Sequence, residues 1–144
     1  MQKSNFEFLR EQWPILADLG ELAEQNLYTD PNTTLIKLRI FGEKIVDYMF
    51  AYDDLDAPED STQYNKLKIL KREGLMNEKI LDIFHLLRRA GNKAVHDAYD
   101  SLDKSKTVLS LAYKAGVWFM QVFGECDFEA EGFVLPAESE STLR

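Results

Sequence analysis

The sequence has few residues that form disulfides or bind metal ions. It has one cysteine, Cys126, and two histidines in 144 residues. A single cysteine cannot form an internal disulfide, and two histidines eleven residues apart do not complete a zinc site with it. No apolar run approaches the roughly 18 residues that a membrane span needs, and no apolar signal core follows the N-terminal residues. We therefore expect a cytoplasmic protein without a membrane anchor or a metal site.

Motifs for several enzyme classes are also missing. There is no glycine-rich phosphate loop, which excludes a Walker-type nucleotide site. No Glu-x-x-His pair is present for a di-iron bundle, and no serine lies in the sequence context of a nucleophile. The paired carboxylates Asp53 and Asp54 lie in a run of acidic residues, which is typical of a solvated loop. We expect no cofactor in this chain.

Charge is distributed unevenly along an acidic chain. The formal net charge is −8, so the surface as a whole does not attract nucleic acid. Residues 53–60 carry five acids and no base, and residues 125–140 carry six acids and no base. Residues 66–93, in contrast, carry eight bases against three acids. This basic segment is either an ordinary solvated face or a local surface for an anionic partner.

Apolar residues recur at helical spacing over most of the chain, and no strand pattern of useful length occurs. The pattern predicts five helices, at about residues 5–27, 31–52, 62–73 and 77–96, and a last one that follows a turn at residues 97–101 and ends before Gly124. Pro14 is expected to kink or briefly break the first helix, and Gly91 is a point where the fourth can break. Gly42 lies in mid-helix, which suggests a close contact with a neighbouring helix.

The predicted fold class is therefore all-α, a bundle of about five helices joined by short loops. Residues 4–124 are expected to form this bundle. Residues 125–144 are expected to form an acidic tail, or a linker towards a missing downstream region.

The fourth predicted helix concentrates the polar chemistry of the chain. At 100° per residue, one stripe about 100° wide holds His85, Arg88, Arg89, Asn92 and His96. Such a helix buries its opposite, apolar face and presents a row of hydrogen-bond donors. The candidate catalytic residues are Arg89, Asn92 and His96. The candidate residues for binding nucleic acid or a partner are Arg88, Arg89, Asn92, Lys93 and His96.

Histidine and arginine together are the minimum groups for metal-independent RNA cleavage. One group moves the proton of the 2′-hydroxyl, and the other stabilises the charge of the phosphorane. The alternative is structural: His96 would cap a helix end, and the arginines would pair with acids such as Asp82 and Asp97. On residue types alone the structural interpretation is the more common one. We expect His85, with apolar neighbours in sequence, to be a packed or surface residue and not a catalyst.

Three segments of the chain, in this order, resemble a known family. They are Ser4-Asn-Phe-Glu-Phe-Leu-Arg-Glu-Gln-Trp-Pro14, the helix start Asp30-Pro31, and Leu86-Leu-Arg-Arg-Ala-Gly-Asn-Lys-Ala-Val-His96. Over roughly residues 4–124 the chain resembles the N-terminal helical domain of the restriction (R) subunits of type I restriction-modification enzymes and related helicases. That domain is usually placed in the HEPN-like superfamily of helical bundles.

The resemblance implies that the chain is a fragment of a longer protein. The remaining parts would supply an ATP-driven DNA translocase and a nuclease module. DNA cleavage and ATP hydrolysis, with their ATP and Mg²⁺, would then belong to the parent protein. The implied partners are the downstream helicase and nuclease modules and other restriction-modification subunits. The polar row itself leaves DNA or RNA, and a second copy of the chain in a dimer, open as partners.

The resemblance also provides a test for ribonuclease activity. HEPN ribonucleases carry an arginine, four to six residues and a histidine, commonly Arg-Asn-x-x-x-His. Residues 92–96 match the last five positions, but Gly91 stands in place of the arginine, and Arg89 reaches His96 only at the upper limit of the looser spacing.

Three hypotheses follow from these observations. The one we expect is an accessory interaction domain of an R subunit, whose polar row positions nucleic acid or a partner subunit. The alternative is a HEPN-type metal-independent ribonuclease that uses Arg89 and His96. A third is a structural bundle whose acidic surface contacts basic regions of a partner.

Overall fold

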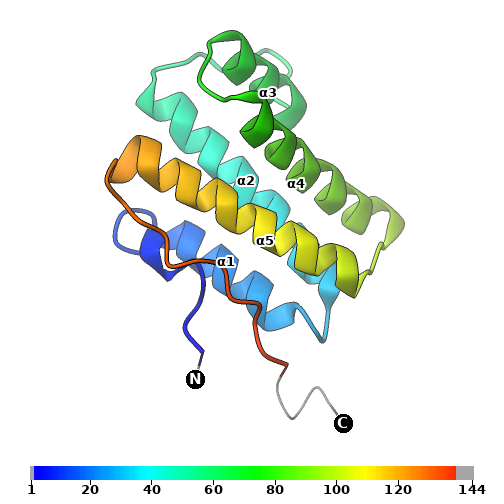
Figure 1. Ribbon diagram of the computed structural model, residues 1–144. Coiled ribbons are helices and arrows are strands. Elements are labelled where there is room, and N and C mark those ends of the chain that lie inside the picture. The colour runs from blue at the N-terminus through cyan, green and yellow to red at the C-terminus, as the bar shows by residue number, and fades with distance from the viewer. Residues whose placement is uncertain (1, 139–144) are drawn as a thin grey trace.

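Five helices pack together, with the long second helix at the centre (Figure 1). The computed structural model describes residues 2–138. The helices are α1 (Pro14–Asn26), α2 (Pro31–Tyr52), α3 (Gln63–Arg72), α4 (Glu78–Asp97) and α5 (Leu102–Phe119), with a 3-10 turn η1 (Glu7–Leu9) before them and a π-helical turn η2 (Met120–Gly124) after them. No helix in the described part has the length and apolar character that crossing a membrane requires. The predicted all-α fold with five helices is confirmed.

Local sequence signals decide where the helices begin. The carboxylate of Asp30 accepts a hydrogen bond from the N–H of Thr33, and Pro31 takes the first position of α2. The side chains that cap α3, α4 and α5 in the same way are Thr62, Asn77 and Ser101. The predicted starts at Asp30 and Asn77 are therefore confirmed.

The structure decides two expectations about helix continuity. The helix expected at about residues 5–27 is broken and not kinked, because residues 10–13 separate the 3-10 turn from α1, and Pro14 begins α1. Proline tolerates the first position of a helix, where its missing N–H has no partner in any case. Helix α4 does not break at Gly91 but continues to Asp97, since Gly91 is buried against α2 and packing holds the helix on both sides of it.

Helix α2 packs against all four other helices and forms the middle of the core. Its side chains Leu38, Phe41 and Ile45 are fully buried. A Cβ atom at Gly42 would lie 3.1 Å from Cδ1 of Leu87 on α4. The contact expected at Gly42 is therefore close, but side chains of α4 and not its backbone make it, and it joins α2 to the helix that carries the polar residues.

Asn32 joins the beginning of α2 to the end of α4. Its Nδ2 atom donates to the carbonyl oxygens of Ala94 and Tyr99, both at 2.8 Å. Its backbone N–H donates to Oδ1 of Asp100 at 3.1 Å. The last carbonyl groups of a helix have no partner inside the helix, so these bonds stabilise the end of α4. That end carries His96.

Candidate functional site

Two of the predicted residues on α4 line a groove shared with α2, α3 and the loop before α3. The groove has a volume of about 510 Å³. Its lining residues are Glu43, Asp60, Thr62, Gln63, Tyr64, Asn65, Arg88 and Asn92. His85 lies beside it, with the centroid of its ring 5.8 Å from that of Tyr64. The groove is lined mainly by polar side chains, and both signs of charge are present.

Arg88 contacts aromatic and imidazole groups and no carboxylate. Its Nε atom lies 3.4 Å from Nδ1 of His85, and its guanidinium carbon lies 5.3 Å from the ring centroid of Tyr64. Among residues 2–138, no acid lies within ion-pair distance of Arg88 or Arg89. The expected pairing of these arginines with Asp82 and Asp97 is therefore wrong.

Arg39 on α2 belongs to this site, and the sequence analysis missed it. Its Nη1 atom donates to Oδ1 of Asn92 at 3.2 Å. Its Nε atom is buried without a hydrogen-bond partner among the described residues, and Oε2 of Glu43 lies 3.7 Å away. A Cβ atom at Gly91 would lie only 2.2 Å from Cβ of Arg39. The side chain of Arg39 therefore fills the space beside Gly91, and no motif within α2 indicates this contact.

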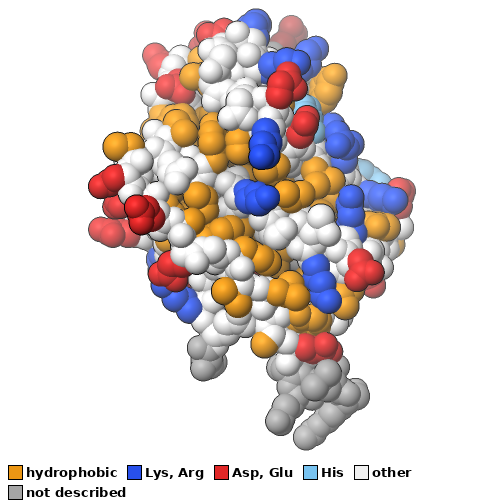
Figure 2. Space-filling model, viewed as in Figure 1, with side chains coloured by type: hydrophobic (Ala, Val, Ile, Leu, Met, Phe, Trp, Pro, Cys, Tyr) orange, Lys and Arg blue, Asp and Glu red, His pale blue; other side chains and the backbone are white. Residues whose placement is uncertain are grey.

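Three other predicted residues, Arg89, Lys93 and His96, are exposed on the outer side of α4, and we call them the outer row. Lys93 covers the ring of Tyr99, with Nζ 4.2 Å from the ring centroid. Figure 2 shows basic and histidine side chains gathered along the edge that α4 forms, with a few acidic side chains among them, and mainly acidic side chains at the opposite edge. Arg89 and His96 are about 10 Å apart along the helix axis. The structure places them on one exposed face and not in a shared pocket.

The surroundings of His85 lower its pKa from the ordinary value of 6.5. Burial is the main cause, and the positive charges of Arg88 and Arg89 act in the same direction. His85 is therefore neutral at pH 7, and its Nδ1 atom can accept the hydrogen bond from Arg88. A neutral imidazole in this position adds no charge to the groove.

We expect an NMR titration to find that His85 takes up its proton below pH 6.5. The variant Arg88→Gln should raise this pKa. It removes the positive charge of Arg88, which is the largest cause of the lowered pKa apart from burial. The folded-state pKa lies below the unfolded one, so the associated stability is present above about pH 6.5 and is lost as the pH falls through the folded-state pKa. Lys114→Gln on α5 serves as the control. A His85 pKa that Arg88→Gln leaves unchanged would contradict this account.

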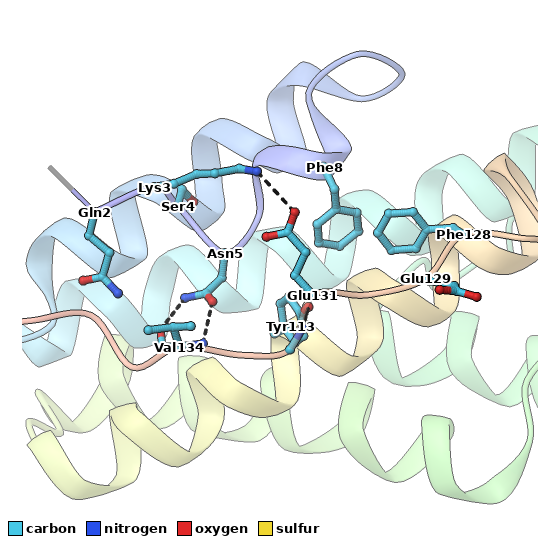
Figure 3. A pocket seen from close by; sticks show the side chains of 11 residues that line it. Gln2, Lys3, Ser4, Asn5, Phe8, Tyr113, Phe128, Glu129, Glu131 and Val134 are labelled. Carbon is cyan, nitrogen blue, oxygen red and sulfur yellow. Dashed lines mark hydrogen bonds and ion pairs between the residues drawn. The ribbon is translucent and has the colours of Figure 1, made fainter.

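A second hollow lies between the N-terminal segment and the tail, and it has a volume of about 280 Å³ (Figure 3). Nδ2 of Asn5 donates to the carbonyl oxygen of Val134 at 2.7 Å, and the N–H of Val134 donates to Oδ1 of Asn5 at 2.8 Å. Phe8 stacks on Phe128 with ring centroids 4.9 Å apart. None of the predicted site residues lines this hollow. The hollow is formed where residues 125–138 of the predicted tail pack on the bundle. The rest of that tail, residues 139–144, lies outside the described part.

Known proteins show what this chain is similar to. A family model described as a domain of unknown function, DUF4145, matches residues 21–117. The type I restriction enzyme EcoKI endonuclease subunit of Escherichia coli (strain K12) is 37% identical over 142 residues. This alignment covers 98% of the chain but only 12% of that relative, in its N-terminal region. The predicted resemblance to restriction-enzyme subunits is confirmed. No solved structure matches, so the HEPN-like relationship stays a prediction.

Proposed function

Because the chain belongs to the DUF4145 family and nearly all of it is similar to part of a type I restriction endonuclease subunit, we propose that it is the N-terminal accessory domain of an R subunit. In this proposal the parent protein is a cytoplasmic ATP-dependent DNA translocase and endonuclease. In this proposal the chain itself neither cleaves DNA nor hydrolyses ATP. Their partners are the downstream helicase and nuclease modules and other restriction-modification subunits. The HEPN-like classification of the bundle is part of the same proposal.

The outer row supports a role in positioning nucleic acid. Arg89 has no acid within ion-pair distance in the described part, and neither has Lys93. Both lie in the segment where bases outnumber acids, on a molecule that is otherwise acidic. Lysine and arginine side chains bind phosphates and release the counterions of nucleic acid, so such binding weakens as salt rises. With a net charge of −8, the domain alone should bind weakly and serve to orient DNA that the parent protein holds.

We expect the double variant Arg89→Glu/Lys93→Glu to weaken DNA binding at low salt by about tenfold or more. Two lost phosphate contacts should also reduce the slope of log affinity against log salt by about 2. Fluorescence anisotropy with a short labelled duplex measures both quantities. Lys114→Glu, an exposed lysine on α5, makes a single charge reversal outside the outer row. Wild-type binding that does not weaken with salt, or equal binding by the double variant, would contradict the nucleic-acid role.

The coding sequence after residue 144 tests the proposed parent protein. Helicase motifs in the same reading frame are the expected result. A stop codon directly after residue 144 would contradict an R subunit as the parent.

A metal-independent ribonuclease is the second candidate function. It is favoured by the exposure of Arg89 and His96 on one face of α4, where a second copy of the chain could complete a site. RNA incubated with the purified protein in a chelator would then be cleaved, and His96→Ala would abolish the cleavage because it removes the group that transfers protons. RNA that stays intact at high protein concentration rules this candidate out.

A further inference from the structure

One arginine, Arg88, lines the groove beside α4, and a second, Arg39, contacts the lining residue Asn92. Arg39 comes from α2 and Arg88 from α4, and Asn92 lies next to both. Oδ1 of Asn92 accepts the hydrogen bond from Arg39, and Asn92 is one helical turn after Arg88. The amide nitrogen of Asn92 has no hydrogen-bond partner among residues 2–138, which leaves this donor for a ligand.

These two guanidinium groups make few contacts with carboxylates. Two carboxylates line the groove, Glu43 and Asp60. Glu43 lies 3.7 Å from Nε of Arg39, which is beyond hydrogen-bond distance, and its side chain is 39% exposed. Asp60 lies 3.5 Å from the amide of Asn65 and makes no ion pair in the described part of the chain. Arg88 has no acidic partner there at all. The two arginines and two carboxylates balance in formal charge, but the guanidinium and amide N–H groups near Asn92 outnumber the contacts that these acids make.

We propose that this groove binds a phosphodiester of single-stranded nucleic acid, held by Arg39, Arg88 and the amide of Asn92. The proposal deepens the nucleic-acid role proposed above and rests on it. The planar guanidinium group can donate two parallel hydrogen bonds to phosphate oxygens, which suits a site built from two arginines. An incoming phosphate would replace Glu43 as the counter-charge of Arg39.

Tyr64 provides the preference for a single strand. Its side chain lines the groove and is 49% exposed, within cation–π distance of Arg88. The bases of a single strand are free to stack on an aromatic side chain, whereas the bases of a duplex are already stacked on each other. A base next to the bound phosphate can therefore stack on the exposed part of Tyr64.

The electrostatic field around the groove is consistent with an anionic ligand. Burial and the charge of Arg89 both lower the pKa of Arg88. Positive charges, including that of Lys71, also lower the pKa of His85, and only Asp82 acts against them. A bound phosphate would reduce the repulsion among these cations. The same field makes a cationic ligand unfavourable in this part of the groove.

The experiment measures binding of a labelled oligothymidylate of 12 nucleotides, and of a duplex of the same length, at low salt. The single strand should bind more tightly. Arg39→Met and Arg88→Met keep most of the apolar stem of each side chain and should each weaken its binding by about tenfold. Tyr64→Leu should weaken single-strand binding by about tenfold and leave duplex binding unchanged, while Tyr64→Phe keeps the affinity.

Glu43→Gln gives the sharpest control, because its expected effect has the opposite sign. Removing the competing carboxylate should tighten single-strand binding by about threefold. Unchanged or weaker binding by Glu43→Gln would overturn the site, as would equal binding of single strand and duplex. Circular dichroism verifies that each variant is folded.

The outer-row variant separates this inference from the proposed function. If Arg89→Glu/Lys93→Glu weakens binding and the groove variants do not, the groove is not the site and the nucleic-acid role stands. If the groove variants weaken binding and the outer-row variant does not, the groove is the site and the role of the outer row is wrong. If neither set has an effect, both are wrong.

Discussion

Replacing Gly91 with alanine should destabilise the domain by about 2 kcal/mol or more. In the interior of an exposed helix, the same change ordinarily stabilises by about 1 kcal/mol. Here the new Cβ would lie 2.2 Å from Cβ of Arg39. Both atoms are attached directly to the backbone, so no change of side-chain rotamer can separate them, and α2 and α4 would have to move apart. Urea unfolding followed by circular dichroism measures the loss.

Arg39→Gly provides the matched rescue for this prediction. It removes the atom with which the new methyl group would collide, although glycine itself costs about 1 kcal/mol in a helix. The double variant should therefore be more stable than the sum of the two single effects, by about 1 kcal/mol or more in a double-mutant cycle. Additive effects, or a Gly91→Ala variant that is more stable than the wild type, would show that the two helices are not in close contact here.

The same contact leaves no room for an arginine at position 91. An arginine side chain begins with the same Cβ that the packing excludes. The space that it would need is occupied by the side chain of Arg39. The guanidinium group that reaches Asn92 therefore comes from α2, and not from the residue before Asn92.

Replacing Phe41 with alanine should cost about 3–5 kcal/mol of the free energy of unfolding. Phe41 is fully buried on the central helix, and its ring meets that of Phe6 edge to face with centroids 5.3 Å apart. On the α5 side, its Cζ atom would lie 3.3 Å from a Cβ at Gly116. Alanine would leave a cavity between α2, α5 and the N-terminal segment. Such a loss is a large part of the roughly 5–15 kcal/mol that stabilises a typical domain.

Val122→Ala is the surface comparison for Phe41→Ala. Val122 is 56% exposed, so its truncation should change stability by less than about 0.5 kcal/mol. Thermal and urea unfolding of both variants measure the difference. A loss below about 1 kcal/mol for Phe41→Ala would mean that the contact between α2 and α5 is not part of the core.

The helices were predictable because their signals are local. Asp30 and Asn77 cap helices through hydrogen bonds to N–H groups three residues ahead, which any four-residue window contains. The error at Gly91 and the open choice at Pro14, between a kink and a break, have the same origin. Pro14 and Gly91 carry strong local signals, but the surrounding chain decides what they do: Pro14 begins a helix, and Gly91 allows two helices to approach closely.

The candidate site was predictable only in part. Helical spacing correctly predicts that the polar residues of α4 lie away from its most buried face. It gives no information about which neighbouring helix covers each edge of that face. For this reason the division between the groove, with Arg88 and Asn92, and the exposed outer row became visible only when α3 and α2 were placed beside α4.

Interactions between near neighbours in the chain account for the all-α fold, the helix starts and the polar face of α4, since apolar spacing and capping act over a few residues. Contacts between residues far apart in the chain decide the rest. Arg39 and Asn92 are 53 positions apart, and their hydrogen bond exists only because Gly91 lets α2 and α4 approach. The sequence pattern of either helix alone does not predict this contact. The contact of Arg39 with Asn92 at the groove is therefore a property of how the helices pack.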